Sequence, residues 1–181
     1  MSGFRRCTVR SYELDFLREI KTDIRPFRDA DAAMLCEIFY RSVHEVASAK
    51  YSSEQLDAWA PTIPDPASWL ERLQQYDTFV AENDRSKIIA WISMSPAGYI
   101  DMLFCLPEAT GGGVATQLYL AVERAALSRS IARLTAHASL LAQPFFAKHG
   151  WLVDNHETIV RNGVTIPRAE MSKQLTRTNC C

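Results

Sequence analysis

The feature that most constrains this chain is a run of three glycines, Gly111–Gly113, between a strand pattern and a helix pattern. The preceding stretch "GYIDMLFCLP" is rich in apolar and aromatic residues and ends at a proline, which is typical of a strand. The following stretch "VATQLYLAVERAALSRS" has apolar residues at helical spacing. Glycine is a poor helix former, but the free amides at a helix start attract anions, and glycines let a phosphate approach closely. The pattern therefore favours a phosphate-binding turn, and a loose turn is the alternative.

Two common phosphate-binding motifs do not match these glycines. No lysine follows them, so the P-loop pattern G-x-x-x-x-G-K-(S/T) is not met. The dinucleotide pattern G-x-G-x-x-G is not met either. A nucleotide-binding α/β protein that uses this turn for ATP is therefore the weaker rival.

Composition narrows the class of protein. With 181 residues, 48% of them apolar and 23% charged, the chain fits a single globular domain with a sizeable core. A net charge of −1 argues against nucleic acid as a partner. Because no apolar run approaches the roughly 18 residues of a membrane-spanning helix and no signal-peptide block is present, we expect a cytoplasmic protein with no membrane partner. The five cysteines are scattered without metal-binding spacing, which predicts reduced thiols and no metal.

The order of the expected elements predicts a mixed α/β sheet. The patterns indicate a strand at 23–28, then helices, then three strands before the glycines. A helix, a strand, a short helix and two strands follow, with "RNGV" as a turn between the last two. Antiparallel strands followed by strand–helix–strand crossovers give such a sheet. We expect one domain at 23–176, an N-terminal extension at 1–22 and a C-terminal tail at 177–181.

Several residues have local interpretations. Asp29 is suited to cap the first helix, and Ser52 or Ser53 the second, with Pro66 near the start of the third. The stripe expected to bury the long helix comprises Val114, Leu118, Ala121, Val122 and Ala125. Of the four histidines, His44 is interpreted as a helix-face residue, and His149 and His156 as surface residues.

The segment "LFCLPEATGGGVATQLYLAVERAA" resembles the acyl-CoA-binding motif of the GNAT superfamily of acyl-CoA-dependent N-acyltransferases. In that motif a strand, a proline and an acidic residue precede (Q/R)-x-x-G-x-(G/A), which falls on 110–115 with Thr110 in place of Gln or Arg. The segment "AHASLLAQPFFAKHGW" is similar to the family's strand and helix ending in F-Y-x-x-x-G-F, and "MSKQL" is similar to its closing strand. The pattern in "YSSEQLDAWAP" resembles one bacterial branch. The resemblance covers about residues 23–175.

The resemblance implies an α/β (α+β) fold with a mixed, mostly antiparallel sheet of about seven strands, flanked by helices, in which the fourth and fifth strands splay apart. It implies acetyl-CoA as co-substrate and no metal. The diphosphate of coenzyme A would rest on the amides that follow Thr110, and the pantetheine arm would pair with the edge of the fourth strand. The cofactor-binding residues implied in this way are Phe104, Cys105, Leu106, Thr110, Gly111, Gly112, Gly113, Val114, Ala115, Thr116, Ser139, Phe145 and Phe146.

Amide formation requires a base for the incoming ammonium group and an acid for the departing thiolate. In many relatives the acid is the tyrosine of F-Y-x-x-x-G-F, but this chain has Phe146 there, so Phe145 and Phe146 are expected to pack against the cofactor or the core. The candidate catalytic residues are Asp101 in an apolar strand, His137 on the fifth strand, and Tyr51 in the expected acceptor segment. A paired strand carboxylate, a hydrogen-bonded structural histidine and a packed aromatic ring are the respective alternatives.

The resemblance therefore predicts an N-acetyltransferase that moves an acetyl group from acetyl-CoA to a primary amine, by direct attack in a ternary complex. A small-molecule acceptor is favoured over a protein, because no separate recognition module is evident. The alternative is a non-catalytic acyl-CoA-binding or sensing domain, which the phenylalanine at position 146 would suit. Dimers are common in the family, so a homodimer is an open possibility.

Overall fold

The computed structural model describes residues 22–176. The expected C-terminal tail and, apart from Thr22, the expected N-terminal extension lie outside the described residues. The strands are β1 (Asp23–Pro26), β2 (Asp77–Glu82), β3 (Ile88–Met94), β4 (Tyr99–Cys105), β5 (Arg133–Ser139), β6 (Leu152–Arg161) and β7 (Val164–Gln174). The α-helices are α1 (Ala32–Arg41), α2 (Ser53–Trp59), α3 (Pro66–Gln75), α4 (Val114–Ser128) and α5 (Ala142–Lys148). Shorter 3₁₀ or π segments are η1 (Asp29–Asp31), η2 (Ser42–Val46), η3 (Ala47–Ala49) and η4 (Pro107–Ala109).

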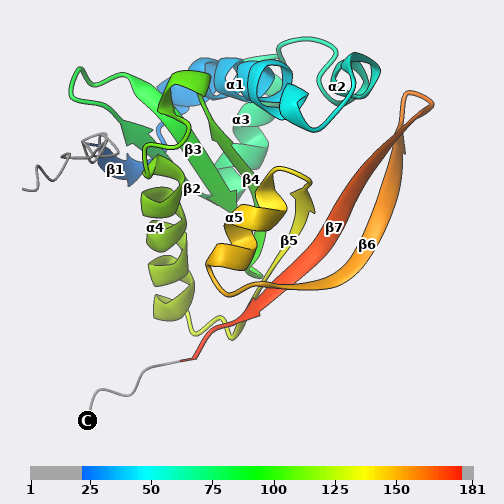
Figure 1. Ribbon diagram of the computed structural model, residues 1–181. Helices are drawn as coiled ribbons and strands as arrows, with labels where there is room; N and C mark the ends of the chain where they lie inside the picture. Colours follow the sequence, from blue (N-terminus) through cyan, green and yellow to red (C-terminus); the bar gives the residue numbers. More distant parts are fainter. Residues whose placement is uncertain (1–21, 177–181) are drawn as a thin grey trace, which may run out of the picture.

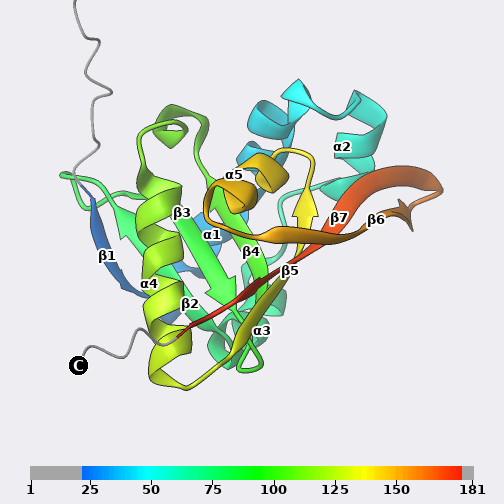
Figure 2. The same cartoon turned by 60° about the horizontal axis from the view of Figure 1, so that its bottom comes forward.

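Within residues 22–176, seven strands form one sheet in the order β1-β2-β3-β4-β5-β7-β6. All neighbours are antiparallel except β4 and β5, which run parallel. This parallel pairing is limited to Tyr99 with Thr135 and Ile100 with Ala136, so the two strands separate beyond Ile100. Helices α1 and α3 cover one face of the sheet and α4 and α5 the other (Figures 1 and 2). The mixed, mostly antiparallel sheet with parted central strands is confirmed.

The core lies around β3 and α4. Every residue of β3 is buried, as expected for a central strand covered on both faces. The buried stripe of α4 includes Val114, Leu118 and Val122, as the helical spacing predicts, but it continues through Ala126. Ala125 is only half-buried, so its assignment to the stripe was wrong by one position.

The helix starts and turns follow local chemistry. Ser52 accepts a hydrogen bond from the Gln55 amide, while the Gln55 side chain bonds the Ser52 amide, so α2 begins with a capping box. Asp65 caps α3, whose first residue is Pro66. Asp29 does not cap the first helix: the chain enters through η1, and the Asp31 carboxylate accepts from the amide of the preceding Arg28.

The β6–β7 hairpin extends beyond the body of the sheet, with its tip beside α2 (Figure 1). Its turn has Asn162 at φ 49° and Gly163 at φ 80°, the left-handed pair that a tight hairpin requires. The Tyr51 hydroxyl donates to the Pro167 carbonyl oxygen at 2.9 Å and accepts from the Leu140 amide at 2.8 Å. The Gln55 side chain adds a bond to the Thr165 carbonyl oxygen. These contacts fasten the α2 region to the hairpin and to the end of β5.

No helix among the described residues is both long and apolar enough to cross a membrane.

Candidate active site

A narrow cavity of about 190 Å³ opens where β4 and β5 part. The second half of β4 forms one wall and the turns of η2 form another. Most of its lining is apolar, and the residues are Ser42, Val43, Val46, Ala47, Trp59, Leu103, Phe104, Cys105, Thr110, Ala115, Ser139, Leu141, Ala142 and Phe145. We call this space the narrow cavity. The start of α4 lies at one side of it, because Thr110 and Ala115 are among its lining residues.

The start of α4 presents open backbone. Gly111 and Gly113 have φ values of 82° and 80°, in the left-handed region that favours glycine. Gly113 is the N-cap residue, and no side chain of residues 22–176 accepts a hydrogen bond at this helix start. A methyl group built on Gly111 or Gly113 would meet no atom within 4 Å. Apart from the Gly112 amide, which donates to the Ala109 carbonyl oxygen at 3.4 Å, the amides of this helix start have no hydrogen-bond partner among residues 22–176, as an anion-binding turn requires.

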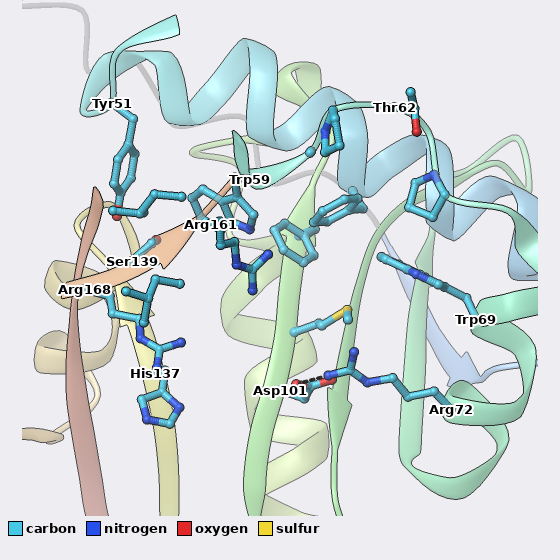
Figure 3. Close-up of a pocket in the computed structure, with 18 of the residues that line it drawn as sticks. Tyr51, Trp59, Thr62, Trp69, Arg72, Asp101, His137, Ser139, Arg161 and Arg168 are labelled. Carbon is cyan, nitrogen blue, oxygen red and sulfur yellow. Dashed lines mark hydrogen bonds and ion pairs between the residues drawn. The ribbon is translucent and has the colours of Figure 1, made fainter. Parts of the chain in front are cut away.

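A wider cavity of about 450 Å³ adjoins the narrow one (Figure 3). Aromatic rings from α1, α2, α3 and β4 form much of its wall, and they belong to Phe39, Trp59, Trp69, Tyr99 and Phe104. Its charged lining residues are Arg72, Asp101, Arg161 and Arg168, and Tyr51, His137 and Ser139 add polar groups. We call it the wide cavity.

The two cavities share Trp59, Phe104 and Ser139 in their walls. They therefore meet at the end of β5, beside the last half of β4. A long ligand in the narrow cavity and a second molecule in the wide cavity would come into contact at this point, which we call the junction.

Asp101 lies on β4 in the wide cavity (Figure 3). Its Oδ1 accepts a hydrogen bond from Arg72 at 2.6 Å, while Oδ2 is buried without a hydrogen-bond partner among the described residues. The side chain is 8% exposed. Burial raises the pKa of this carboxyl group, although the Arg72 cation opposes the shift. A carboxylate with a raised pKa in a cavity has the chemistry of a general base.

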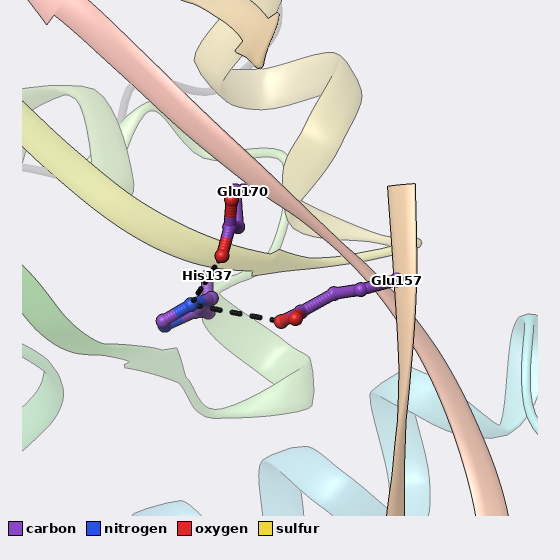
Figure 4. Close-up of side chains that lie close together, drawn as sticks. All are labelled: His137, Glu157 and Glu170. Carbon is purple, nitrogen blue, oxygen red and sulfur yellow. Dashed lines mark ion pairs between the residues drawn. The ribbon is translucent and has the colours of Figure 1, made fainter. Parts of the chain in front are cut away.

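His137 extends into the wide cavity from β5. Its Nδ1 lies 3.0 Å from the Tyr99 hydroxyl, and its Nε2 lies 3.6 Å from Glu157 and 3.5 Å from Glu170 (Figure 4). One ligand atom from each of His137, Glu157 and Glu170 lies within 4.8 Å of the others, a spacing that could hold a metal ion. In this cluster, Oε1 of Glu157 already accepts a 2.5 Å hydrogen bond from the Arg168 guanidinium group. The positive charge of Arg168 therefore partly balances the two carboxylates.

Tyr51 also lines the wide cavity, with its hydroxyl tied to the backbone of Leu140 and Pro167. Burial raises the pKa of this phenol, although the bond to the Leu140 amide opposes the shift. The three candidate catalytic residues therefore lie in one cavity, near but outside the narrow one.

The two adjacent phenylalanines have different environments. Phe145 lines the narrow cavity. Phe146 is 3% exposed and packs in the core, with its ring 4.6 Å from that of Trp151. His149, expected at the surface, is half-buried, and its ring lies 4.6 Å from that of the buried Tyr119. The surface assignment of His149 was therefore wrong, because the helix end folds back onto α4.

Of the other expected cofactor residues, Phe104, Cys105, Thr110, Ala115 and Ser139 line the narrow cavity. Leu106 and Val114 are almost fully buried, so only their backbone could serve a ligand. The Thr116 hydroxyl lies 3.4 Å from Nε2 of His149.

Sequence reasoning missed two groups of lining residues. Arg161 and Arg168 belong to a hairpin that the sequence indicated only as two strands and a turn, yet their period-2 spacing with Ile159 and Ile166 marks one face. The other group is Val43, Val46 and Ala47, around the π segment η2. A wide turn of this kind recurs at functional sites, but its sequence fits an ordinary helix.

The geometry is therefore two cavities that meet where β4 and β5 part: an apolar one beside the glycine-rich start of α4, and a larger one with aromatic and charged walls. The chain matches a family described as "Acetyltransferase (GNAT) domain" over residues 47–175, and it belongs to that family. It is an acyl-CoA-dependent N-acetyltransferase by its family and its relatives.

The relatives agree. The chain is 38% identical to the uncharacterized N-acetyltransferase YafP of Escherichia coli K12 over 128 residues, which are 71% of this chain and 79% of that protein. A GCN5-related N-acetyltransferase from Rhodopseudomonas palustris is 32% identical, with a TM-score of 0.80 over 86% of this chain and 98% of that one. The PaiA N-acetyltransferase of Thermoplasma acidophilum, solved with coenzyme A, has the same fold, with 18% identity and a TM-score of 0.71 over 86% and 100% of the two chains.

Proposed function

We propose that this enzyme transfers an acetyl group from acetyl-CoA to the primary amine of a small molecule, by direct attack while both substrates are bound. The junction of the two cavities carries the proposal, because it allows a thioester and an amine to meet without either leaving its own cavity. The wide cavity, at about 450 Å³, is of the size that small-molecule ligands occupy.

The residues present fit coenzyme A. The amides of Gly111 and of residues 113–116 would hold its diphosphate, since they lie at an uncapped helix start, whereas the Gly112 amide donates to the Ala109 carbonyl oxygen. The exposed edge of β4 at Phe104 and Cys105 would pair with the pantetheine arm, and Phe145 would contact it. Coenzyme A in the PaiA structure supports this assignment. Acetyl-CoA supplies the activated acetyl group.

Direct attack is favoured over a covalent acetyl-enzyme by the state of the cysteine in the narrow cavity. Burial raises the pKa of the Cys105 thiol to about 12. At neutral pH that thiol is therefore protonated, and a protonated thiol is a poor nucleophile.

The proton transfers are assigned within the wide cavity. Asp101 would accept the proton of the incoming ammonium group, and His137 is the alternative base. Tyr51 is protonated at neutral pH and lies next to the end of β5, so it could supply the proton that the departing thiolate needs. The phenylalanine at position 146, which would suit a non-catalytic domain, packs in the core and lines neither cavity, so it does not count against acetyl transfer.

The test is a steady-state measurement of acetyl transfer to a panel of primary amines, with both substrates varied. Direct attack predicts intersecting double-reciprocal lines, and Cys105→Ala should keep turnover within about threefold of wild type, because the thiol takes no part in transfer. The matched control is Cys36→Ala, which removes a buried thiol that lines neither cavity. Parallel lines together with an inactive Cys105→Ala variant would overturn direct attack. Coenzyme A binding without turnover on any amine would overturn the proposed acceptor class.

A further inference from the structure

The wall of the wide cavity is positively charged although the chain as a whole has a net charge of −1. Three arginines, Arg72, Arg161 and Arg168, line this cavity, and Asp101 is its one acidic lining residue among the described part of the chain. An excess of positive charge in the wall of a cavity favours ligands of the opposite sign.

Two of the three arginines are already paired. Arg72 donates to Asp101 at 2.6 Å, and Arg168 donates to Glu157 at 2.5 Å. Their charges are therefore largely balanced by neighbouring carboxylates. Arg161 differs, because it has no hydrogen bond or ion pair with any residue in the range 22–176.

The hairpin directs Arg161 into the cavity. It pairs with Val164 across the turn, and alternate residues of β6 and β7 share its face, so Ile159 and Ile166 lie on the same side. Figure 3 shows the guanidinium groups of Arg161 and Arg168 both pointing into the cavity from the hairpin, across from Asp101. Arg161 is exposed as a whole, and partial desolvation together with the nearby cations Arg168 and Arg72 lowers its pKa, while Tyr99 opposes the shift.

We propose that the acceptor amine also carries an anionic group, a carboxylate or a phosphate, and that Arg161 binds this group with Arg168 beside it. Arginine suits this role because its planar fork forms two parallel hydrogen bonds with either anion. With the anion on the hairpin side, the amine of the same molecule faces Asp101 on β4. This inference rests on the proposed function and names its substrate class.

The test compares amines that differ only in the anionic group. One pair is L-phenylalanine and L-phenylalaninamide, which probes a carboxylate; the other is O-phosphoethanolamine and ethanolamine, which probes a phosphate. Binding is measured by calorimetry in the presence of coenzyme A, and acetyl transfer is measured separately. In at least one pair the anionic member should bind about tenfold or more tightly than its neutral partner, and the pair that shows this difference identifies the anion.

Three variants locate the effect. Arg161→Gln should weaken binding of the preferred anionic amine about 10- to 100-fold and leave its neutral partner and coenzyme A within about threefold. Arg161→Lys keeps the charge and should recover part of the loss. The matched control Arg133→Gln removes an exposed arginine on β5, which bonds Asp154 and lines neither cavity, and should change nothing.

Equal binding within both pairs, or no binding of either anionic probe, would overturn the anionic acceptor. An Arg161→Gln variant that keeps wild-type selectivity would overturn the assigned residue. If the anionic amine binds with the expected dependence on Arg161 but is never acetylated, the anion site stands and the proposed transfer to that amine fails. The two proposals therefore fail in different measurements.

Discussion

The narrow and wide cavities meet at Ser139, but they are built in different ways. In the narrow cavity one continuous stretch from β4 to the first turn of α4 provides the strand edge and the open amides, and mostly apolar side chains of η2 and α5 line other parts of it. The wide cavity depends on side chains from segments far apart in the chain, with aromatic rings from the helical face and arginines from α3 and the β6–β7 hairpin.

This difference separates the ligand specificity that follows from the fold from the ligand specificity that depends on individual side chains. Backbone amides at a helix start remain whatever the neighbouring side chains are, so the ligand of the narrow cavity follows from the fold. Side chains in the wide cavity can change without altering the sheet, so the acceptor follows from particular residues such as Arg161. Side-chain variants in the wide cavity should therefore lower turnover and leave coenzyme A binding unchanged, whereas a variant that blocks the amides at the start of α4 should weaken coenzyme A binding. The opposite pattern would contradict this comparison.

The largest expected effect is in the wide cavity. Asp101→Asn should lower kcat about 10²- to 10⁴-fold, the usual contribution of a general base, while coenzyme A binding stays within about threefold. Because burial raises the pKa of Asp101, wild-type kcat/KM should fall as pH decreases through a value above the ordinary range of a carboxyl group. The base works only when ionised, so this acidic limb should be absent from the variant. The measurement is a pH–rate profile of both proteins.

The matched control is Asp77→Asn. Asp77 is a strand carboxylate with an arginine partner, Arg129, and it lines neither cavity. Its replacement should leave kcat within about threefold, since no reacting group depends on it. If both variants lose activity equally, or if the acidic limb survives in Asp101→Asn, the base is another residue, and His137 is next.

The second effect is in the narrow cavity and tests its dependence on backbone. Gly113→Val should weaken coenzyme A binding about 100-fold or more, because the side chain would fill the open space before the amides. A valine at a φ of 80° also strains the backbone by roughly 1–3 kcal/mol. Gly150→Val is the control, since Gly150 has the same φ and equally open surroundings but follows the end of α5 instead of preceding the start of α4. Calorimetry of both variants separates strain from lost binding; equal losses of affinity would contradict the amide cradle.

The same contrast explains how far the sequence could predict this protein. The strand pattern, the α2 cap at Ser52, the hairpin turn at Gly163 and the glycine-rich helix start are each determined within a few residues, and the structure confirms them. The fold's parted strands followed from the family resemblance, which rested on the same local motifs.

What could not be predicted depends on contacts between distant segments. Arg161 faces the wide cavity only because the hairpin reaches α2, where Gln55 bonds Thr165. Asp29 fails as a cap because Asp31 is bound by the Arg28 amide and by Arg25, a strand residue. His149 is drawn inward by the ring of Tyr119 on another helix. Local sequence patterns do not contain information on contacts between residues far apart in the chain. The wide cavity was therefore less predictable than the narrow one.

The smallest effect on turnover is expected from Phe146→Tyr, which restores the tyrosine that many relatives have. The Phe146 ring is 3% exposed and packs against Trp151, and it lines neither cavity, so a hydroxyl added to it would be buried in the core and would not reach the junction. Turnover should stay within about threefold of wild type, while the free energy of unfolding should fall by about 1–3 kcal/mol if the hydroxyl finds no partner.

Phe145→Tyr is the matched variant, since that ring lines the narrow cavity and a phenol there would lie beside the bound thioester. Steady-state rates and denaturant unfolding of the two variants give the comparison. A rise in kcat for Phe146→Tyr of tenfold or more would show that this side chain reaches the reacting sulfur, and Tyr51 would then lose its proposed role as the acid.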